Sequence, residues 1–221
     1  MAIPLLDVID IEGKTITGDA LLTQRRFADY LVADRFAHYH FTVKGNQSGL
    51  LEDLILYFRD RNEPDAISVD SGHGRIETRK IWTTAELNGY LDFPWVGQAF
   101  VIERESINKK TGRLSQETAY GVTSCKPNEA SAGKVLKTNR EHWCIENSCH
   151  YIIDWNFDED RSRIRTGNGP ENISRLRRFA VGLIKSKGVP SVAQKMRQLS
   201  MNVRAVFDYL RMTKNSSVTC L

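Results

Sequence analysis

The sequence predicts an α/β protein with an antiparallel β segment in its middle and a helical C-terminal part. Three observations lead to this prediction. Strand-like and helix-like patterns alternate over the first 60 residues, strand-like patterns alone follow between residues 75 and 124, and helical patterns fill the chain after Gly133. Alternating strands and helices are typical of parallel strands joined by crossover helices, whereas consecutive strands joined by turns favour antiparallel pairing.

The first part of the chain supplies two strands and two longer helices. Aromatic and β-branched residues predict strands over residues 14–20 and 38–44. Apolar residues at helical spacing predict helices over residues 24–33 and 48–59. A short helical turn over residues 4–10 comes before them.

The middle and the end of the chain differ in kind. The middle predicts three strands, over residues 75–84, 99–106 and 115–124, with a turn at 108–112. The end predicts three helices, over residues 139–153, 173–186 and 191–212, and a polar loop over 158–171. We therefore expect four segments: 1–70, a βαβα unit; 71–132, a β-rich insertion; 133–186, a helical return to the core; 187–221, a basic C-terminal helix.

Composition excludes several classes of protein. Of the 221 residues, 41% are apolar and 26% are charged, which is enough to bury a core and argues against a disordered chain. No run of about 18 apolar residues exists, so no transmembrane helix is expected. The first residues lack the basic start of a signal peptide, which predicts a cytoplasmic location. The four cysteines lack Cys-x-x-Cys spacing, which argues against a thiolate zinc site and a disulfide framework.

Positive charge gathers near the C-terminus. From Lys185 onward seven lysines and arginines face one acid, Asp208, although the net charge of the whole chain is only +4. Such a distribution favours a polyanionic partner such as nucleic acid, or it is a solvated helix face. Charge alone leaves both interpretations open.

Asp19 is the first candidate for chemistry. It follows a predicted strand of a parallel unit, and ligand-binding groups in such sheets gather where the strands end. A carboxylate at this position is either a metal ligand or the N-cap of the next helix.

A second candidate lies on the predicted helix over residues 139–153. His142, Glu146 and His150 are spaced i, i+4 and i+8, so they share one face. That face is a divalent-metal site or an ordinary polar stripe. If it is a metal site, the chain could also be a metalloprotein of unrelated function that binds zinc through these three residues.

The polar loop and one glycine turn complete the candidates. Arg161, Arg163 and Arg165 alternate along the loop, which suits phosphate contacts or ion pairs with the preceding acids. The sequence at residues 44–47 lacks the spacing of a phosphate-binding loop, so a turn is expected there.

These residues together carry a resemblance to a known family. Residues 139–147, 154–165 and 170–172 resemble the C-terminal signature of insertion-sequence DDE transposases, in particular the H-repeat-associated branch. Residues 18–24, 39–47 and 71–79 are similar to earlier blocks of the same family. The resemblance runs from about Ala2 to about Leu210, and the order and spacing of the blocks are more specific than any single block.

The resemblance implies a partial RNase-H-like fold with a β insertion before the helix that bears the last acid. It implies Mg²⁺ (or Mn²⁺) ions held by two aspartates and a glutamate, which cut and join DNA strands. By match, Asp19 is the second acid and Glu146 the third. Supporting roles near them or near DNA are implied for Lys44, Asn46, His73, Arg75, Arg140, His142 and Asn147. The implied partners are double-stranded DNA and a further copy of the chain, on the bacterial nucleoid and with no membrane.

The sequence departs from the family at its beginning. The family's first aspartate belongs to an Asp-Gly-Lys block well upstream of the second, and only 18 residues precede Asp19. We therefore expect a polypeptide that lacks the N-terminal part of the family and is weakly active or inactive. The alternative is a DNA-binding remnant without catalysis. The strand of Asp19 would then be an exposed sheet edge.

Overall fold

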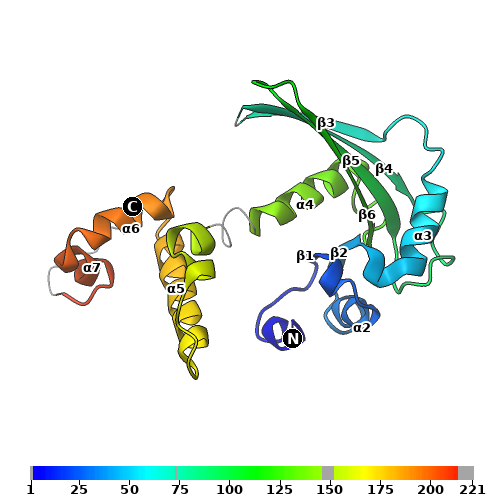
Figure 1. The fold of residues 1–221 in the computed structure, drawn as a ribbon. Helices are drawn as coiled ribbons and strands as arrows, with labels where there is room; N and C mark the ends of the chain where they lie inside the picture. Colours follow the sequence, from blue (N-terminus) through cyan, green and yellow to red (C-terminus); the bar gives the residue numbers. More distant parts are fainter. Residues whose placement is uncertain (1, 73, 146–151, 214–221) are drawn as a thin grey trace. The chain divides into compact units, whose positions relative to one another are not determined.

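A computed structural model describes residues 2–72, 74–145 and 152–213 (Figure 1). The chain divides into two compact units, Met1–His142 and Trp143–Leu221. No helix in the described ranges is both long and apolar enough to cross a membrane.

The first unit is built on one six-stranded mixed sheet, in the order β1-β2-β6-β5-β4-β3. The strands are β1 (Thr15–Gly18), β2 (His38–Val43), β3 (Ala66–Gly72), β4 (Arg75–Thr84), β5 (Gln98–Asn108) and β6 (Leu114–Thr123). β1 and β2 run parallel, and every other neighbouring pair is antiparallel. The expected α/β class, with parallel strands followed by antiparallel ones, is confirmed.

Helices and aromatic side chains cover one face of this sheet. The helices are α1 (Ile3–Leu6), η1 (Ala20–Leu22), α2 (Arg25–Asp29), η2 (Tyr30–Asp34), η3 (Gly45–Gln47) and α3 (Ser48–Tyr57). Tyr39 and Phe41 of β2 are fully buried and stack on each other at 4.7 Å between ring centroids. Phe27 of α2 stacks on Phe41 in turn, at 5.8 Å. Alternate β2 residues thus anchor this core, as the period of two in a strand requires.

β3 is a strand that the sequence analysis missed. Its outward residues Ile67 and Val69 are exposed, and its inward residues Ala66, Ser68 and Asp70 are small or polar. The alternating apolar residues therefore lie on the solvent side of an edge strand. β3 has no buried apolar face, which is the pattern that predicts a strand. β3 pairs with β4 from Ala66↔Ile81 to Gly72↔Arg75.

Helix α4 (Ala132–Ile145) packs on the opposite face of the sheet. Its buried Val135 and Leu136 join a cluster that contains Ile81, Phe100 and Ile102 of β4 and β5. The helix begins seven residues before the expected start, because Ser131 accepts hydrogen bonds from the backbone of Lys134 and Val135. Residues 146–151 of the expected helix lie outside the described residues.

The second unit is helical in its described part. It contains η5 (Ile152–Asn156), η6 (Glu159–Arg161), α5 (Gly169–Ser186), α6 (Val192–Ser200) and α7 (Val203–Tyr209). The single helix expected over 191–212 is wrong: it is divided at Met201–Asn202, because Asn202 is extended and its Oδ1 caps α7 by accepting from the backbone of Ala205 at 3.1 Å. The expected loop also ends earlier, because Pro170 occupies the first turn of α5, where its missing N–H costs nothing.

Candidate active site

Asp19 lies directly after the last residue of β1, where the strand gives way to η1. Its Oδ1 accepts hydrogen bonds from the backbone N–H groups of Leu21 at 3.1 Å and Leu22 at 3.3 Å. The side chain is nevertheless exposed. The N-cap interpretation therefore holds, and it leaves Oδ2 with no hydrogen bond to any described residue.

The chain around Asp19 is fixed by side chains from the turn that follows and from the end of β2. The hydroxyl of Thr23, which is fully buried, lies within donor distance of two carbonyls: Asp19 at 3.1 Å and Thr42 at 2.7 Å. Asn46 Nδ2 donates to the Ala20 carbonyl at 2.6 Å, and Gln47 Nε2 donates to the Thr23 carbonyl at 3.0 Å. The ends of the two parallel strands are thus tied together beneath one exposed carboxylate.

Helix α4 approaches the same two strands from the other side. The Nδ1 atom of His142 is 3.0 Å from the hydroxyl of Thr17, two residues before Asp19. One turn earlier, Asn139 Oδ1 is 3.2 Å from Nε2 of His40 in β2. Thr17 and His40 are register partners across β1 and β2, so α4 contacts adjacent positions on one face.

His40 is an unusual residue at this contact. It is 3% exposed and stacks on Phe100 at 4.6 Å between centroids. Burial lowers the pKa of His40 to about 4, the hydrogen bond to Asn139 works in the opposite direction, and the nearby His142 lowers it further. His40 is therefore neutral at pH 7 and donates its Nε2–H to the Asn139 amide oxygen.

Three of the expected site residues, Glu146, Asn147 and His73, lie outside the described residues. His150, the third member of the proposed histidine stripe, lies outside them as well. Within the described ranges, no three His, Cys, Asp or Glu side chains are close enough together to hold a metal ion.

Arg140 is turned away from Asp19, toward the outer part of the sheet. It forms an ion pair of 2.7 Å with Asp70 of β3 and is half exposed. The same carboxylate pairs with Arg79 at 3.3 Å. Arg75 lies at the outer end of β4, 3.6 Å from Glu77. The structure thus brings Asn46 and His142 to the strand of Asp19, whereas Arg75, Arg79 and Arg140 belong to the insertion side of the sheet.

Lys44 and the three loop arginines are exposed. Lys44 directly follows β2 and precedes η3. Arg161 lies 3.6 Å from Asp158, whereas Glu159 faces inward and pairs with Arg177 and Ser174 of α5. Arg163 and Arg165 form no ion pair with any described side chain.

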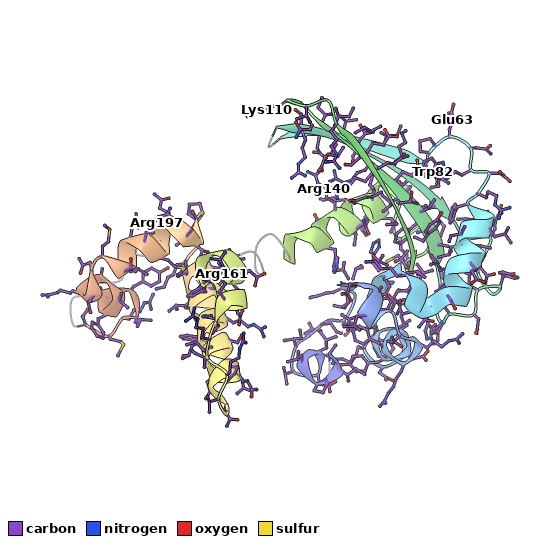
Figure 2. The ribbon with its side chains drawn as sticks, in the orientation of Figure 1. Glu63, Trp82, Lys110, Arg140, Arg161 and Arg197 are labelled. Atoms are coloured by element: carbon purple, nitrogen blue, oxygen red, sulfur yellow. The ribbon has the colours of Figure 1, made fainter. Side chains whose placement is uncertain are left out.

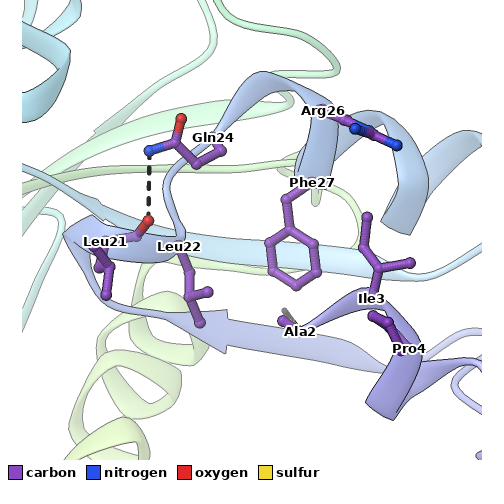
Figure 3. A pocket seen from close by; sticks show the side chains of 8 residues that line it. All are labelled: Ala2, Ile3, Pro4, Leu21, Leu22, Gln24, Arg26 and Phe27. Carbon is purple, nitrogen blue, oxygen red and sulfur yellow. Dashed lines mark hydrogen bonds between the residues drawn. The ribbon is translucent and has the colours of Figure 1, made fainter.

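A pocket of about 540 Å³ lies beside η1, between the N-terminal segment and α2 (Figure 3). Its lining is mostly apolar, and it includes Leu22 and Phe27 with Arg26 and Gln24 as the polar members. Gln24 Nε2 donates to the Leu21 carbonyl at 3.4 Å across its edge. Among the described residues, its lining holds no carboxylate, thiol or imidazole.

Sequence reasoning missed the residues that position Asp19. Thr17, Thr23 and Asn139 make the contacts described above. Thr23 and Asn139 lie inside the blocks that resemble the family, at residues 18–24 and 139–147, but neither was predicted to position Asp19. The contact of His142 joins residues 125 positions apart, and that of Asn139 joins residues 99 apart. Only the position of Thr17 and Asp19 two residues apart, which puts them on one side of an extended chain, could have suggested Thr17.

Comparisons with known proteins point to one family. A family model described as "Transposase DDE domain" matches residues 1–181. The protein named "Putative transposase YncI" of Escherichia coli O157:H7 is 30% identical over 224 residues, covering 95% of this chain and 56% of its own length. The "H repeat-associated putative transposase YhhI" of Escherichia coli K12 is 31% identical over 216 residues, covering 91% of this chain and 56% of its own length.

The chain therefore spans a little over half the length of the curated relatives that it matches. The family model nevertheless covers both parallel strands, all four antiparallel strands, α4 and most of α5. The chain belongs to the transposase DDE domain family.

Proposed function

We propose that this chain acts in DNA transposition as a transposase polypeptide with an RNase-H-like core, in which Asp19 and Glu146 hold the divalent ions used for strand cleavage and transfer. The family membership supports a transposase. The RNase-H-like core, the two acids and the DNA partner are the parts that we propose.

One observation carries the proposal. Asp19 ends the strand to which α4 is joined by the contact between His142 and Thr17. His142 precedes Glu146 by four residues in the sequence, so the helix that ends one residue before the proposed third acid is tied to the strand that ends one residue before Asp19, the proposed second acid.

The donor chemistry of Asp19 fits a divalent metal ion. The backbone N–H groups hold Oδ1, while Oδ2 remains available in an exposed position. Hard cations such as Mg²⁺ prefer carboxylate oxygen. When bound, such ions supply an activated nucleophile and stabilise the departing oxygen of a phosphodiester.

The other residues keep Asp19 in place. The Thr23 hydroxyl and the Asn46 and Gln47 amides fix the turn that carries the carboxylate. His142 donates to or accepts from Thr17 and so orients the end of α4. These groups fix the position of the Asp19 carboxylate. A metal site requires ligands that are held in fixed positions.

From the resemblance we propose that these 221 residues hold two of the family's three acids, Asp19 and Glu146, and not the first aspartate. An incomplete ligand set binds metal weakly, so we expect the isolated chain to cut DNA slowly or not at all.

Nicking of supercoiled plasmid DNA tests the catalytic proposal. Purified protein is incubated with the plasmid in 5–10 mM Mg²⁺ or Mn²⁺ or in EDTA, roughly the range that weakly held hard cations need. We expect slow, metal-dependent nicking that Asp19→Asn and Glu146→Gln each abolish. Asp60→Asn is the matched control, because Asp60 is exposed and forms no ion pair with a described residue. Nicking that survives both site variants would remove these acids from the mechanism.

The second candidate function is DNA binding without cleavage. Residues 143–221 carry thirteen lysines and arginines against seven acids, whereas residues 1–142 carry 18 against 20. Positive charge is thus concentrated in the unit that contains Arg161, Arg163 and Arg165. This reading predicts salt-dependent DNA binding in EDTA and no nicking in any metal.

A further inference from the structure

The ends of the two β hairpins in the insertion meet at one point of the first unit. The β3–β4 turn holds Gly74, and the β5–β6 turn covers residues 109–113. The backbone N–H of Lys109 donates to the Gly74 carbonyl at 2.8 Å, and Lys109 Nζ lies 2.7 Å from the Ser71 hydroxyl. Figure 2 shows Lys110 at this outer end of the sheet, well beyond Arg140 on α4. We call this pair of turns the basic tip.

The β5–β6 turn of the basic tip is a preformed structure. Asn108 Oδ1 accepts hydrogen bonds from the backbone N–H groups of Lys110 at 2.9 Å and of Thr111 at 3.1 Å. The Gly112 N–H donates to the Asn108 carbonyl at 2.8 Å. Gly74 and Gly112 adopt φ values of +75° and +66°, which a side chain would strain. Side chains on such turns start from a fixed backbone, which lowers the entropy lost on binding.

The basic tip carries positive charge alone. Between residues 71–76 and 107–114 the sequence places Arg75, Lys109, Lys110 and Arg113, and no aspartate or glutamate. The whole span from Ala66 to Thr123 has seven basic and seven acidic residues, so this concentration is not a property of the insertion as a whole.

The acids nearest the tip are already engaged. Asp70 pairs with Arg79 and Arg140, and Glu105 pairs with Lys80. Glu117 pairs with Arg104.

Glu77, which faces Arg75, is shared by several guanidinium groups. Burial raises the pKa of its carboxyl, but Arg79 and Arg104 beside it outweigh that effect and lower the pKa. The acids near the tip are thus paired with other basic residues. Lys110 and Arg113 form no ion pair with any described residue and are exposed.

The position of the basic tip suits a polyanion with a long, regular charge array. Gly121 of β6 lies at the level where β2 ends beside Asp19, and Leu114 begins the strand at the tip. The seven residue steps from Leu114 to Gly121 correspond to roughly 23 Å along the strand at about 3.3 Å per residue. Duplex DNA advances about 3.4 Å per base pair, so the same length spans about seven base pairs.

We propose that the basic tip binds the phosphate backbone of double-stranded DNA at a point displaced from Asp19, along the strand direction, by the length of roughly seven base pairs. The inference rests on the proposed function for the identity of the polyanion. It assigns to the insertion a role in holding DNA, through phosphate contacts that are independent of base sequence.

Fluorescence anisotropy with a labelled 30-base-pair duplex tests the inference, with EDTA present so that cleavage plays no part. The test variant is Lys110→Gln/Arg113→Gln, whose side chains support no described hydrogen bond or ion pair. The matched control is Lys14→Gln/Lys126→Gln, which removes the same charge at the opposite end of the strands.

Each phosphate contact contributes a slope of about −0.9 to the dependence of log affinity on log salt. We expect the tip variant to reduce the magnitude of this slope by about 2 and to bind several-fold more weakly at low salt. The control is expected to change the slope by less than about half of that. Thermal melting by circular dichroism checks that both variants fold as the wild type does.

The outcomes separate this inference from the proposed function. Equal effects of the tip and control variants would mean a charge effect of the whole protein and would overturn the inference, while DNA binding by the chain would stand. No DNA binding by the wild type would overturn both. A selective loss in the tip variant supports the inference even where the plasmid assay shows no nicking.

Discussion

His40 shows how one buried side chain links the packing of α4 to pH. Its pKa is lowered from 6.5 to about 4, mainly by burial between β2, α4 and Phe100. The folded state therefore resists a proton that the unfolded chain accepts. The stability due to neutral His40 is complete above pH 6.5 and is lost as the pH falls toward 4.

We expect the free energy of unfolding to fall between pH 6.5 and 4, with His40 responsible for roughly 3 kcal/mol of the change. Urea unfolding at half-unit steps of pH measures it. His40→Gln should be less stable but flatter over this window, and His38→Gln should keep the wild-type slope. If His40→Gln does not fold, the imidazole pKa of the wild type can be measured by NMR, and a value near 6.5 would contradict the prediction.

The position of Asp19 could be predicted from the sequence, but most of its surroundings could not. Its place at the end of a strand was predictable from the run Thr15-Ile16-Thr17-Gly18 and from the break that follows. Its cap on η1 was one of two alternatives, and the structure shows the cap. The contacts of Thr23 with Thr42 and of His142 with Thr17 depend on tertiary packing between distant segments, which local patterns do not encode.

At the scale of elements, buried strands were more predictable than edges and helix boundaries. β4 has the predicted limits, and its Ile81 and Trp82 are buried on the two faces of the sheet, whereas β3 exposes its apolar side. Helix α4 starts early because a serine at position 131 caps a stretch of modest apolar content. The break between α6 and α7 depends on one asparagine that local apolar spacing does not reveal.

Asn202 provides a direct test of that break. Replacing a capping asparagine by alanine costs about 1 kcal/mol of helix stability. We expect Asn202→Ala to speed amide hydrogen exchange in α7 by about fivefold or more while α5 exchanges as before. Asn202→Ser should retain most of the protection, because serine caps nearly as well. Unchanged exchange in α7 for the alanine variant would show that tertiary contacts, not the cap, hold the helix.

β1 lies at the edge of the sheet, and in the described part of the chain it pairs only with β2. An open strand edge offers unpaired N–H and C=O groups to other chains. We expect the protein to self-associate with rising concentration, and Thr15→Lys to reduce this because a charge on an edge strand opposes pairing. Gln116→Lys adds the same charge at an exposed position of β6 and should have little effect.

Light scattering coupled to size exclusion measures the association across a concentration series. A wild type that stays monomeric at every concentration would contradict the prediction. Equal solubilisation by both lysine variants would mean that net charge, rather than the β1 edge, controls it.

At the scale of the whole molecule, charge and fold are distributed differently between the two units. The sheet unit holds slightly more acids than basic residues, and the helical unit holds nearly two basic residues for each acid. The sequence predicted the basic end of the chain, but it did not predict the basic tip, because Lys109, Lys110 and Arg113 become neighbours of Arg75 only through pairing of β4 with β5.

The pairing of β2 with β6 also determines how long β2 stays without one of its two neighbouring strands during synthesis of the chain. Tyr39 in β2 donates its backbone N–H to Ser124, which is synthesised 85 residues later. At about 5–20 residues per second, the free side of β2 waits roughly 4–17 s for its neighbour. During that interval an aromatic strand with one open side is exposed to other nascent chains. The insertion therefore prolongs the vulnerable phase of biosynthesis, and slower translation of residues 44–123 should lower the yield of folded protein.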